Sequence, residues 1–356
     1  MVTWSDRVAH RVIVDRRQSA RSRRRWVALG ALLLVTWVVV PLAADDYWLT
    51  AILIPFGILS LAGLGLNVLT GFAGQLSVGS AAFMAVGAYT AYNVLLRVPG
   101  VPVLVAFAVG GVTAALAGVL AGLPALRIKG FYLVVSTLAA QFISEWVFTR
   151  FRWFSNDNSS GLVSVPRLTF LGQDLGSPLA RYLLTLGVVS TLTAIALNIP
   201  RSELGRRWMA VRDMDTAAAV IGIPVPRTKL LAFAVSSFYQ GVAGALWGLT
   251  YLGTFDPRTW ELSRSFQILF IIIIGGMGTI SGSFLGAAFM LLLPIAMSQL
   301  GGAFAAGALD QGALENYKKI VFGLLIVAFL VREPGGLARL LEKARERLAS
   351  WPLRAW

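Results

Sequence analysis

Ten apolar runs constrain the fold of this chain more than any other feature of its sequence. A bilayer core is about 30 Å thick, so a helix needs about 20 apolar residues to cross it. A helix also satisfies its own backbone hydrogen bonds inside lipid, whereas an irregular segment does not. We therefore expect an all-α, polytopic integral membrane protein with about ten transmembrane helices, some of them discontinuous. The runs cover residues 26–44, 49–69, 81–96, 101–126, 131–148, 179–199, 230–252, 266–275, 283–300 and 317–331.

Composition excludes several classes of protein. Of the 356 residues only 13% are charged, whereas a soluble domain carries about 25%. Cysteine is absent and the one histidine, His10, lies among arginines, which excludes disulfides, thiol chemistry and sites with several histidines. The chain also lacks a Gly-x-x-x-x-Gly-Lys-[Ser/Thr] phosphate loop, a nucleophile elbow and paired carboxylates. We expect no enzyme activity, no metal and no cofactor on this chain.

The net charge of +14 is concentrated in a few segments. The first 25 residues carry eight arginines, residues 200–229 carry six positive side chains, and the residues after 331 carry six more. Cytoplasmic loops are enriched in Lys and Arg, and ten crossings place all three segments on one face. We expect cytoplasmic termini, a basic tail over 1–25, a transmembrane domain over 26–331 with a cytoplasmic loop over 200–229, and a basic tail over 332–356.

Three of these assignments leave alternatives open. The run 266–275 is too short to cross alone, so nine or eleven crossings also fit. Residues 26–44 also resemble a signal peptide, although Leu42 is large for a cleavage site and another apolar run follows. The last tail predicts a basic amphipathic helix that lies on an anionic lipid surface or caps a partner subunit.

Residues 67–80 join two apolar runs through three glycines and uncharged polar side chains. Such backbone near membrane depth persists where protein or a water-filled cavity satisfies it, as in the broken helices of transporters. An ordinary turn is the alternative, but it would usually carry charge. A second uncharged glycine-rich break, 275–282, fits either a pathway or close helix packing. The candidate pathway residues are Asn67, Gln75, Ser77, Ser80, Tyr89, Tyr132, Thr137 and Glu145.

Four of these candidates also fit roles away from a pathway. Tyr89, Tyr132 and Thr137 suit helix packing better than contact with a ligand. Glu145 is a carboxylate at membrane depth, which favours a functional role. It also lies near a membrane surface, where it could reach water or pair with Arg150.

The basic loop contains a predicted helix of about two turns. Asp215 suits the N-cap position of a helix over 216–221, and Gly222 suits the residue after its end. Two prolines then prevent continuation. A helix this short is marginal in water, so we expect it to dock on a partner, or else on its own chain. The candidate docking residues are Gly205, Arg206, Arg212, Asp213, Asp215, Ala217, Ala218 and Gly222.

Several motifs resemble one family. Residues 67–89 read Asn-Val-Leu-Thr-Gly-Phe-Ala-Gly-Gln-Leu-Ser-Val-Gly-Ser-Ala-Ala-Phe-Met-Ala-Val-Gly-Ala-Tyr, and 122–133 read Gly-Leu-Pro-Ala-Leu-Arg-Ile-Lys-Gly-Phe-Tyr-Leu. Together with segments at 202–206, 217–223, 229–233 and 275–279, they resemble the LivM-type permease subunits of branched-chain amino acid ABC importers. The similarity covers roughly 49–300. The chain departs from the family pattern at Ser80, where histidine is common, and in the outer motif at 156–162.

The resemblance implies a multi-pass protein of the bacterial inner membrane and a set of partners. These are a homologous second permease that forms a heterodimer, two ATPase subunits that bind ATP and Mg, an extracytoplasmic solute-binding protein and membrane lipid, but no nucleic acid. Residues 217–222 would be the coupling helix that docks on an ATPase and converts the pathway between its outward- and inward-facing states.

Branched-chain amino acids are the default solute that the resemblance implies, although relatives also carry urea, short amides and aromatic acids. An ion-coupled secondary transporter is the alternative, and it predicts a deep carboxylate that only Glu145 could supply. A membrane-embedded enzyme lacks the clustered acids and bases it would need. A passive channel would make the loop merely structural.

Overall fold

The structure, a computed structural model, describes residues 35–126, 131–156, 158, 161–166, 168–170, 173–304 and 335–350, with isolated positions between 320 and 332. The chain divides into two units, Met1–Leu49 and Thr50–Trp356. In the first unit, the described residues form the π-helical segment η1 (Val35–Val39) and the helix α2 (Val40–Ala43), which carry exposed apolar side chains. The predicted run 26–44 therefore lies partly outside the described residues.

Six helices of the described chain are long and apolar enough to cross a membrane. They confirm six of the predicted runs, and each end lies within five residues of its predicted position. The chain is therefore an all-α, multi-pass membrane protein. The six are the helix Trp48–Phe72, formed by η2 (Trp48–Leu53), α3 (Ile54–Asn67) and η3 (Val68–Phe72); α5 (Val103–Gly122); α6 (Phe131–Arg150); α7 (Pro178–Asn198); α10 (Val225–Leu246) with η7 (Trp247–Leu252); and α12 (Ile280–Phe304).

Two other predicted runs form shorter helices. The run 81–96 forms α4 (Ser80–Arg97), and the run 266–275 lies in α11 (Leu262–Gly275). Leu262 to Gly275 is only 14 residues, about 21 Å of helix at 1.5 Å per residue, so the helix is too short to cross the membrane alone, as the length of the run predicted. The predicted run 317–331 lies mostly outside the described residues.

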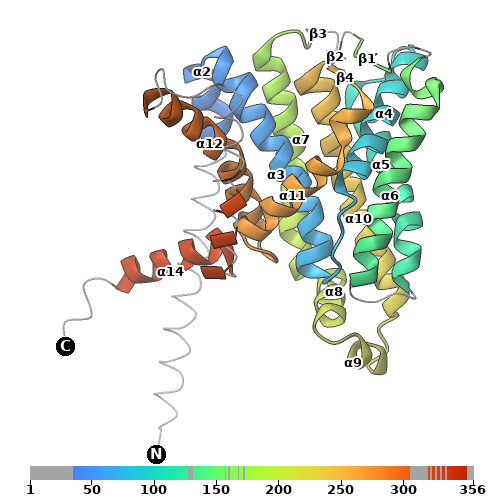
Figure 1. The fold of residues 1–356 in the computed structure, drawn as a ribbon, viewed down its shortest axis with the longest axis vertical. Helices are drawn as coiled ribbons and strands as arrows, with labels where there is room; N and C mark the ends of the chain where they lie inside the picture. Colours follow the sequence, from blue (N-terminus) through green and yellow to red (C-terminus); the bar gives the residue numbers. More distant parts are fainter. Residues whose placement is uncertain are drawn as a thin grey trace, which may run out of the picture. The chain divides into compact units, whose positions relative to one another are not determined.

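The ends of the bundle in the second unit differ in structure. One end carries the antiparallel pair β1 (Val163–Ser164) and β4 (Thr254–Phe255), and the hairpin of β2 (Thr169–Phe170) and β3 (Gln173–Asp174). The other end carries α8 (Glu203–Asp213) and α9 (Asp215–Val220), which project beyond the helices (Figure 1). We refer to these as the strand end and the loop end. The remaining short segments are η4 (Leu123–Leu126), η5 (Arg152–Ser155), η6 (Ile199–Arg201) and η8 (Pro257–Trp260).

The core of the second unit surrounds α10, which packs against α3, α4 and α5. Small residues allow this packing, because a Cβ atom on Gly87 of α4 would overlap the carbonyl oxygen of Gly241 in α10. Glycine contacts of this kind bring membrane helices close enough to gain dispersion energy, which replaces the hydrophobic effect as the driving force in lipid. The bundle is therefore held together by backbone-to-backbone proximity as well as by side chains.

The C-terminal tail forms the helix α14 (Gly336–Ser350), which lies within the predicted amphipathic segment 332–356. Its Ala338 is buried against Gly276, at the end of α11. Arg339, Leu341 and Lys343 are exposed. The first turn of the tail helix thus packs on its own chain, while a basic and apolar face stays available to lipid or to another subunit.

Candidate functional site

The two glycine-rich breaks, separate in the sequence, meet in the structure. Asn67 at the end of α3 donates from Nδ2 to the carbonyl oxygen of Thr279 at 2.7 Å and to Oγ of Ser283 at 3.2 Å. Its Oδ1 accepts from the backbone N–H of Gly278 at 2.8 Å. A Cβ atom on Gly71 would overlap the same N–H, so the two breaks are in direct backbone contact. We call residues 67–79 and 275–283 together the glycine joint.

The helix α4 begins inside the bundle, and other helices cap it. The backbone N–H groups of the first turn of a helix have no partner within that helix. Here the N–H of Ala82 donates to Oε1 of Gln141 at 2.8 Å, and that of Ala81 donates to Oγ of Ser265 at 2.8 Å. Just before the helix, the N–H of Val78 donates to Oγ1 of Thr137 at 3.1 Å. These bonds explain how a broken helix persists at membrane depth.

Gln141 and Ser265 belong to this site, although the sequence patterns had not marked either of them as a site residue. Gln141 also donates from Nε2 to the carbonyl oxygen of Trp260 at 2.7 Å, and its Oε1 accepts from Ser265 Oγ at 3.1 Å. A lone glutamine within an apolar run was the available signal. Thr137, a predicted pathway residue, therefore lies beside Gln141 as a second capping group.

Three predicted pathway residues lie in the extended segment that leads into α4, or at its start. Gln75, Ser77 and Ser80 are all buried. The amide nitrogen and oxygen of Gln75 and the hydroxyl of Ser80 have no hydrogen-bond partner among the described residues. Ser77 Oγ accepts from the N–H of Gly79 at 3.3 Å. Buried polar groups without partners are costly, and Gln75 and Ser80 therefore remain the strongest candidates for contact with a solute or with water.

Tyr89 lies further along α4, in an aromatic cluster toward the strand end. Its ring stacks on Phe148 with centroids 4.3 Å apart and meets the edge of Phe255 at 5.3 Å. Its hydroxyl is buried without a partner in the described chain. Tyr89 thus combines the packing role that the sequence allowed with a free polar group.

Tyr132 and Glu145 are not brought into this arrangement. The side chain of Tyr132 is exposed on α6. Glu145 is half-buried, and its carboxylate forms no hydrogen bond or ion pair with another described residue, so the predicted pair with Arg150 is not observed. Neither residue contributes to the glycine joint.

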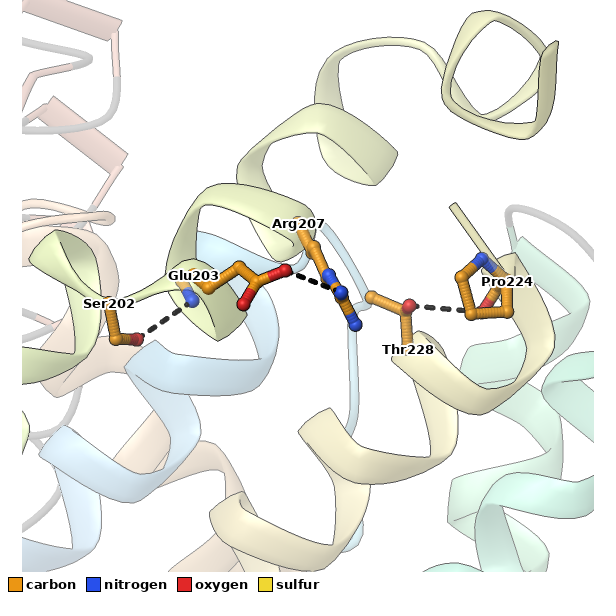
Figure 2. A network of polar contacts seen from close by, with 6 residues as sticks. Ser202, Glu203, Arg207, Pro224 and Thr228 are labelled. Carbon is orange, nitrogen blue, oxygen red and sulfur yellow. Dashed lines mark hydrogen bonds and ion pairs between the residues drawn. The ribbon is translucent and has the colours of Figure 1, made fainter. Parts of the chain in front are cut away.

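The basic loop is a helical unit whose side chains bond to α10. Ser202 caps α8 by accepting from the N–H of Gly205 at 3.1 Å, and Glu203 pairs with Arg207 at 2.5 Å (Figure 2). Trp208 of α8 is fully buried and donates from Nε1 to the carbonyl oxygen of Thr228, in the first turns of α10, at 2.9 Å. Thr228 in turn donates to the carbonyl oxygen of Pro224 at 3.0 Å. Movement of α8 should therefore be transmitted to α10.

Two predicted docking residues have structural roles inside this loop. A Cβ atom on Gly205 would overlap the carbonyl oxygen of Ile199, so glycine permits close approach to η6. Arg206 donates from Nη1 to the carbonyl oxygen of Arg201 at 2.7 Å, although its side chain remains exposed.

Arg212 links the loop to the glycine joint. Its Nη1 donates to the carbonyl oxygen of Gly71 at 2.9 Å, across 141 positions of sequence. Its Nε donates to Oδ1 of Asp213 at 2.9 Å, which orients the guanidinium. The side chain also covers Gly74, where a Cβ atom would lie only 2.5 Å from Cγ of Arg212. The loop end therefore contacts the break directly.

The short helix α9 begins one residue earlier than predicted. Asp215 is its first residue rather than its N-cap, which is Met214, and Asp215 pairs with Lys229 of α10 at 3.8 Å. The helix ends at Val220, one residue earlier than predicted. The predicted role of Gly222 after the helix end is confirmed: it has φ of +87°, and the N–H of Ile223 bonds to the carbonyl oxygen of Ala218 at 3.0 Å.

The faces of α9 differ sharply in burial. Ala218 is only 2% exposed, so it faces its own chain. In contrast, Val220 is 87% exposed, Ile221 74% and Met214 62%, and Ala217 is exposed beside them. We call Met214, Ala217, Val220 and Ile221 the α9 tip. This apolar surface lies at the extreme of the loop end (Figure 1), where apolar side chains would otherwise face water.

The fold and the site are those of a membrane transport protein: they combine membrane-spanning helices, a joint between two broken helices and a projecting helical loop. The family described as "Branched-chain amino acid transport system / permease component" matches residues 48–330, and the chain belongs to that family. The permease protein LivM of the high-affinity branched-chain amino acid transport system of Escherichia coli K12 is 28% identical over 300 residues, which cover 78% of this chain and 67% of LivM.

More distant relatives carry other names. LsrC, a permease protein of an autoinducer 2 import system from Enterobacter, is 29% identical over 222 residues, 61% of each chain. XylH, a xylose transport permease of Escherichia coli K12, is 31% identical over 105 residues, 28% of this chain and 26% of XylH. No solved structure matches the chain.

Proposed function

We propose that this chain is a permease subunit of an ATP-driven ABC importer in the bacterial inner membrane. It pairs with a homologous second permease, two ATPase subunits and an extracytoplasmic solute-binding protein. The chain crosses the membrane about ten times. Both termini and the loop end lie on the cytoplasmic side. Branched-chain amino acids are the default solute, with urea, short amides and aromatic acids as alternatives.

The α9 tip is the observation that carries this proposal. An importer without its own phosphate loop receives energy from an ion gradient or from a partner, and a partner needs a docking surface. The tip is apolar, small and exposed, and Trp208 and Arg212 connect its loop to α10 and to the glycine joint. ATP-driven movement of a docked ATPase would therefore act on the two helix breaks, which is how a local event becomes a change of access.

The ion-coupled alternative has less support. A secondary transporter driven by protons or sodium places ionisable groups along its pathway. Glu145 is the one acid within the described membrane helices, and it lies apart from the joint without a charged partner.

The test is uptake by the whole importer reconstituted in proteoliposomes. We expect accumulation of labelled leucine to require ATP, both ATPase subunits and the solute-binding protein. It should be insensitive to ionophores that dissipate proton and sodium gradients. Accumulation by the permease subunits alone along an ion gradient would favour the alternative.

A further inference from the structure

Arg264, in the first turn of α11, is a half-buried cation that pairs with no carboxylate of the described chain. Its Cζ lies 4.5 Å from the centre of the Trp247 ring. Its Nη1 donates to Oε1 of Gln267 at 2.6 Å. Since a guanidinium has five N–H donors, most of its hydrogen-bonding capacity is uncommitted.

Trp247, whose ring lies against the Arg264 guanidinium, carries a second donor without a partner among the described residues. Its side chain is 5% exposed, and its Nε1 has no hydrogen-bond partner among the described residues. Its ring also contacts Tyr251, with centroids 4.7 Å apart. We call Trp247, Tyr251, Arg264 and Gln267 the Arg264 cluster.

The backbone adds further positive potential. α11 begins at Leu262, next to Arg264, and Ser265 bonds to the first turn of α4 through the N–H of Ala81. Two helix N-termini therefore lie beside the cluster, and each carries a partial positive charge. Half-helix N-termini in transporters point at anionic groups of the solute.

The two nearest acids along the chain form no ion pair with Arg264. Glu261 is exposed at the start of α11. Asp256 Oδ1 is turned to Thr259, whose N–H and hydroxyl donate to it at 3.0 and 2.9 Å. A cation within a membrane helix bundle is costly, and its retention points to a functional partner that carries the opposite charge.

We infer that the Arg264 cluster binds the carboxylate of the transported solute. A carboxylate accepts two parallel bonds from a guanidinium, and the free indole N–H of Trp247 offers a third donor. The inference rests on the proposed function. It narrows the solute class to molecules that carry a carboxylate, such as amino acids or aromatic acids, and excludes urea and neutral amides. A phospholipid headgroup would satisfy the same chemistry, so the test separates the two sources.

The first test compares Arg264→Gln, Arg264→Lys and the parent chain in the reconstituted importer, with labelled leucine and labelled urea as probes. Losing one charged, bidentate contact should lower leucine uptake about tenfold to hundredfold in Arg264→Gln. Arg264→Lys should retain an intermediate rate of leucine uptake, because lysine keeps the positive charge but cannot donate two parallel hydrogen bonds to one carboxylate. Arg258→Gln, which removes an exposed arginine of η8, is the matched control and should behave like the parent.

Each transport result has a defined meaning. Leucine uptake at the parental rate in Arg264→Gln, with ATP dependence intact, would overturn the inference and leave the proposed function standing. Equal losses for leucine and urea would also overturn it. The assay is run in phosphatidylcholine vesicles with and without phosphatidylglycerol, and a defect seen only with the anionic lipid would assign the cluster to a headgroup.

A second measurement does not depend on transport. The chain has no cysteine, so Gln267→Cys creates a single reactive thiol beside Arg264. In the purified complex we expect an anionic methanethiosulfonate to react faster than a cationic one, and leucine to protect the thiol better than leucinamide. Equal protection by the two compounds, or a preference for the cationic reagent, would contradict carboxylate binding even if no uptake were obtained.

Discussion

Replacing Asn67 with alanine is expected to lower the free energy of unfolding by about 2–6 kcal/mol. The substitution removes three hydrogen bonds to the second break and leaves the N–H of Gly278 and the carbonyl oxygen of Thr279 unpaired. Each buried group without a partner costs about 1–3 kcal/mol. Thermal and denaturant unfolding of the purified protein in detergent micelles would measure the loss.

The matched control is Asn198→Ala. Asn198 is exposed near the end of α7 and donates only within its own helix, to the carbonyl oxygen of Ala194 at 3.2 Å. We expect a change within about 0.5 kcal/mol, as for an ordinary surface substitution. Similar losses in the two variants would show that the glycine joint does not depend on the Asn67 amide.

Replacing Val220 with aspartate is expected to lower the rate of ATP-coupled uptake at least about tenfold, while the purified chain remains folded. Val220 is 87% exposed, so the carboxylate does not disturb the interior of this chain. It would be buried without a partner against a docked ATPase, and an unpaired interfacial charge weakens binding by several kcal/mol. Uptake by the reconstituted importer and co-purification of the ATPase would both report the loss.

The aspartate is placed at Val220 so that it tests docking of the ATPase rather than folding of this chain. The same change at Ala218, which is 2% exposed, would disrupt the packing of α9 and confuse folding with docking. Val98→Asp serves as the control because Val98 is an exposed valine just beyond the end of α4, at the strand end. Equal uptake in Val220→Asp and the parent would exclude the α9 tip as the coupling surface.

Much of the fold could be predicted from local sequence. Apolar runs long enough to cross a bilayer identified the helices, because inside lipid a helix is the structure that satisfies its own backbone. Gly222 and the two prolines after it indicated the end of α9. Glycine tolerates the left-handed backbone that follows many helices, and proline cannot extend a helix. The breaks were visible as uncharged glycine-rich segments.

The contacts that make the site could not be predicted in this way. Asn67 bonds to Gly278 across 211 positions, and no periodicity relates two segments so far apart. The burial of Ala218 rather than Ala217 depends on how α9 lies against its own chain, which its composition does not specify. Gln141 and Arg264 were single polar residues at or within apolar runs. Only their neighbours in space show that one caps α4 and that the other stacks on Trp247 without a carboxylate from the described chain.

Site-specific crosslinking from Val220 tests the central claim most directly. Since the chain contains no cysteine, Val220→Cys can be labelled uniquely with a benzophenone maleimide before the importer is assembled with its partners. On illumination we predict a crosslink to an ATPase subunit, with a yield that changes when ATP binds. An intact complex that gives no such crosslink, or a thiol at position 220 that reacts with an impermeant maleimide added outside intact cells, would contradict the account.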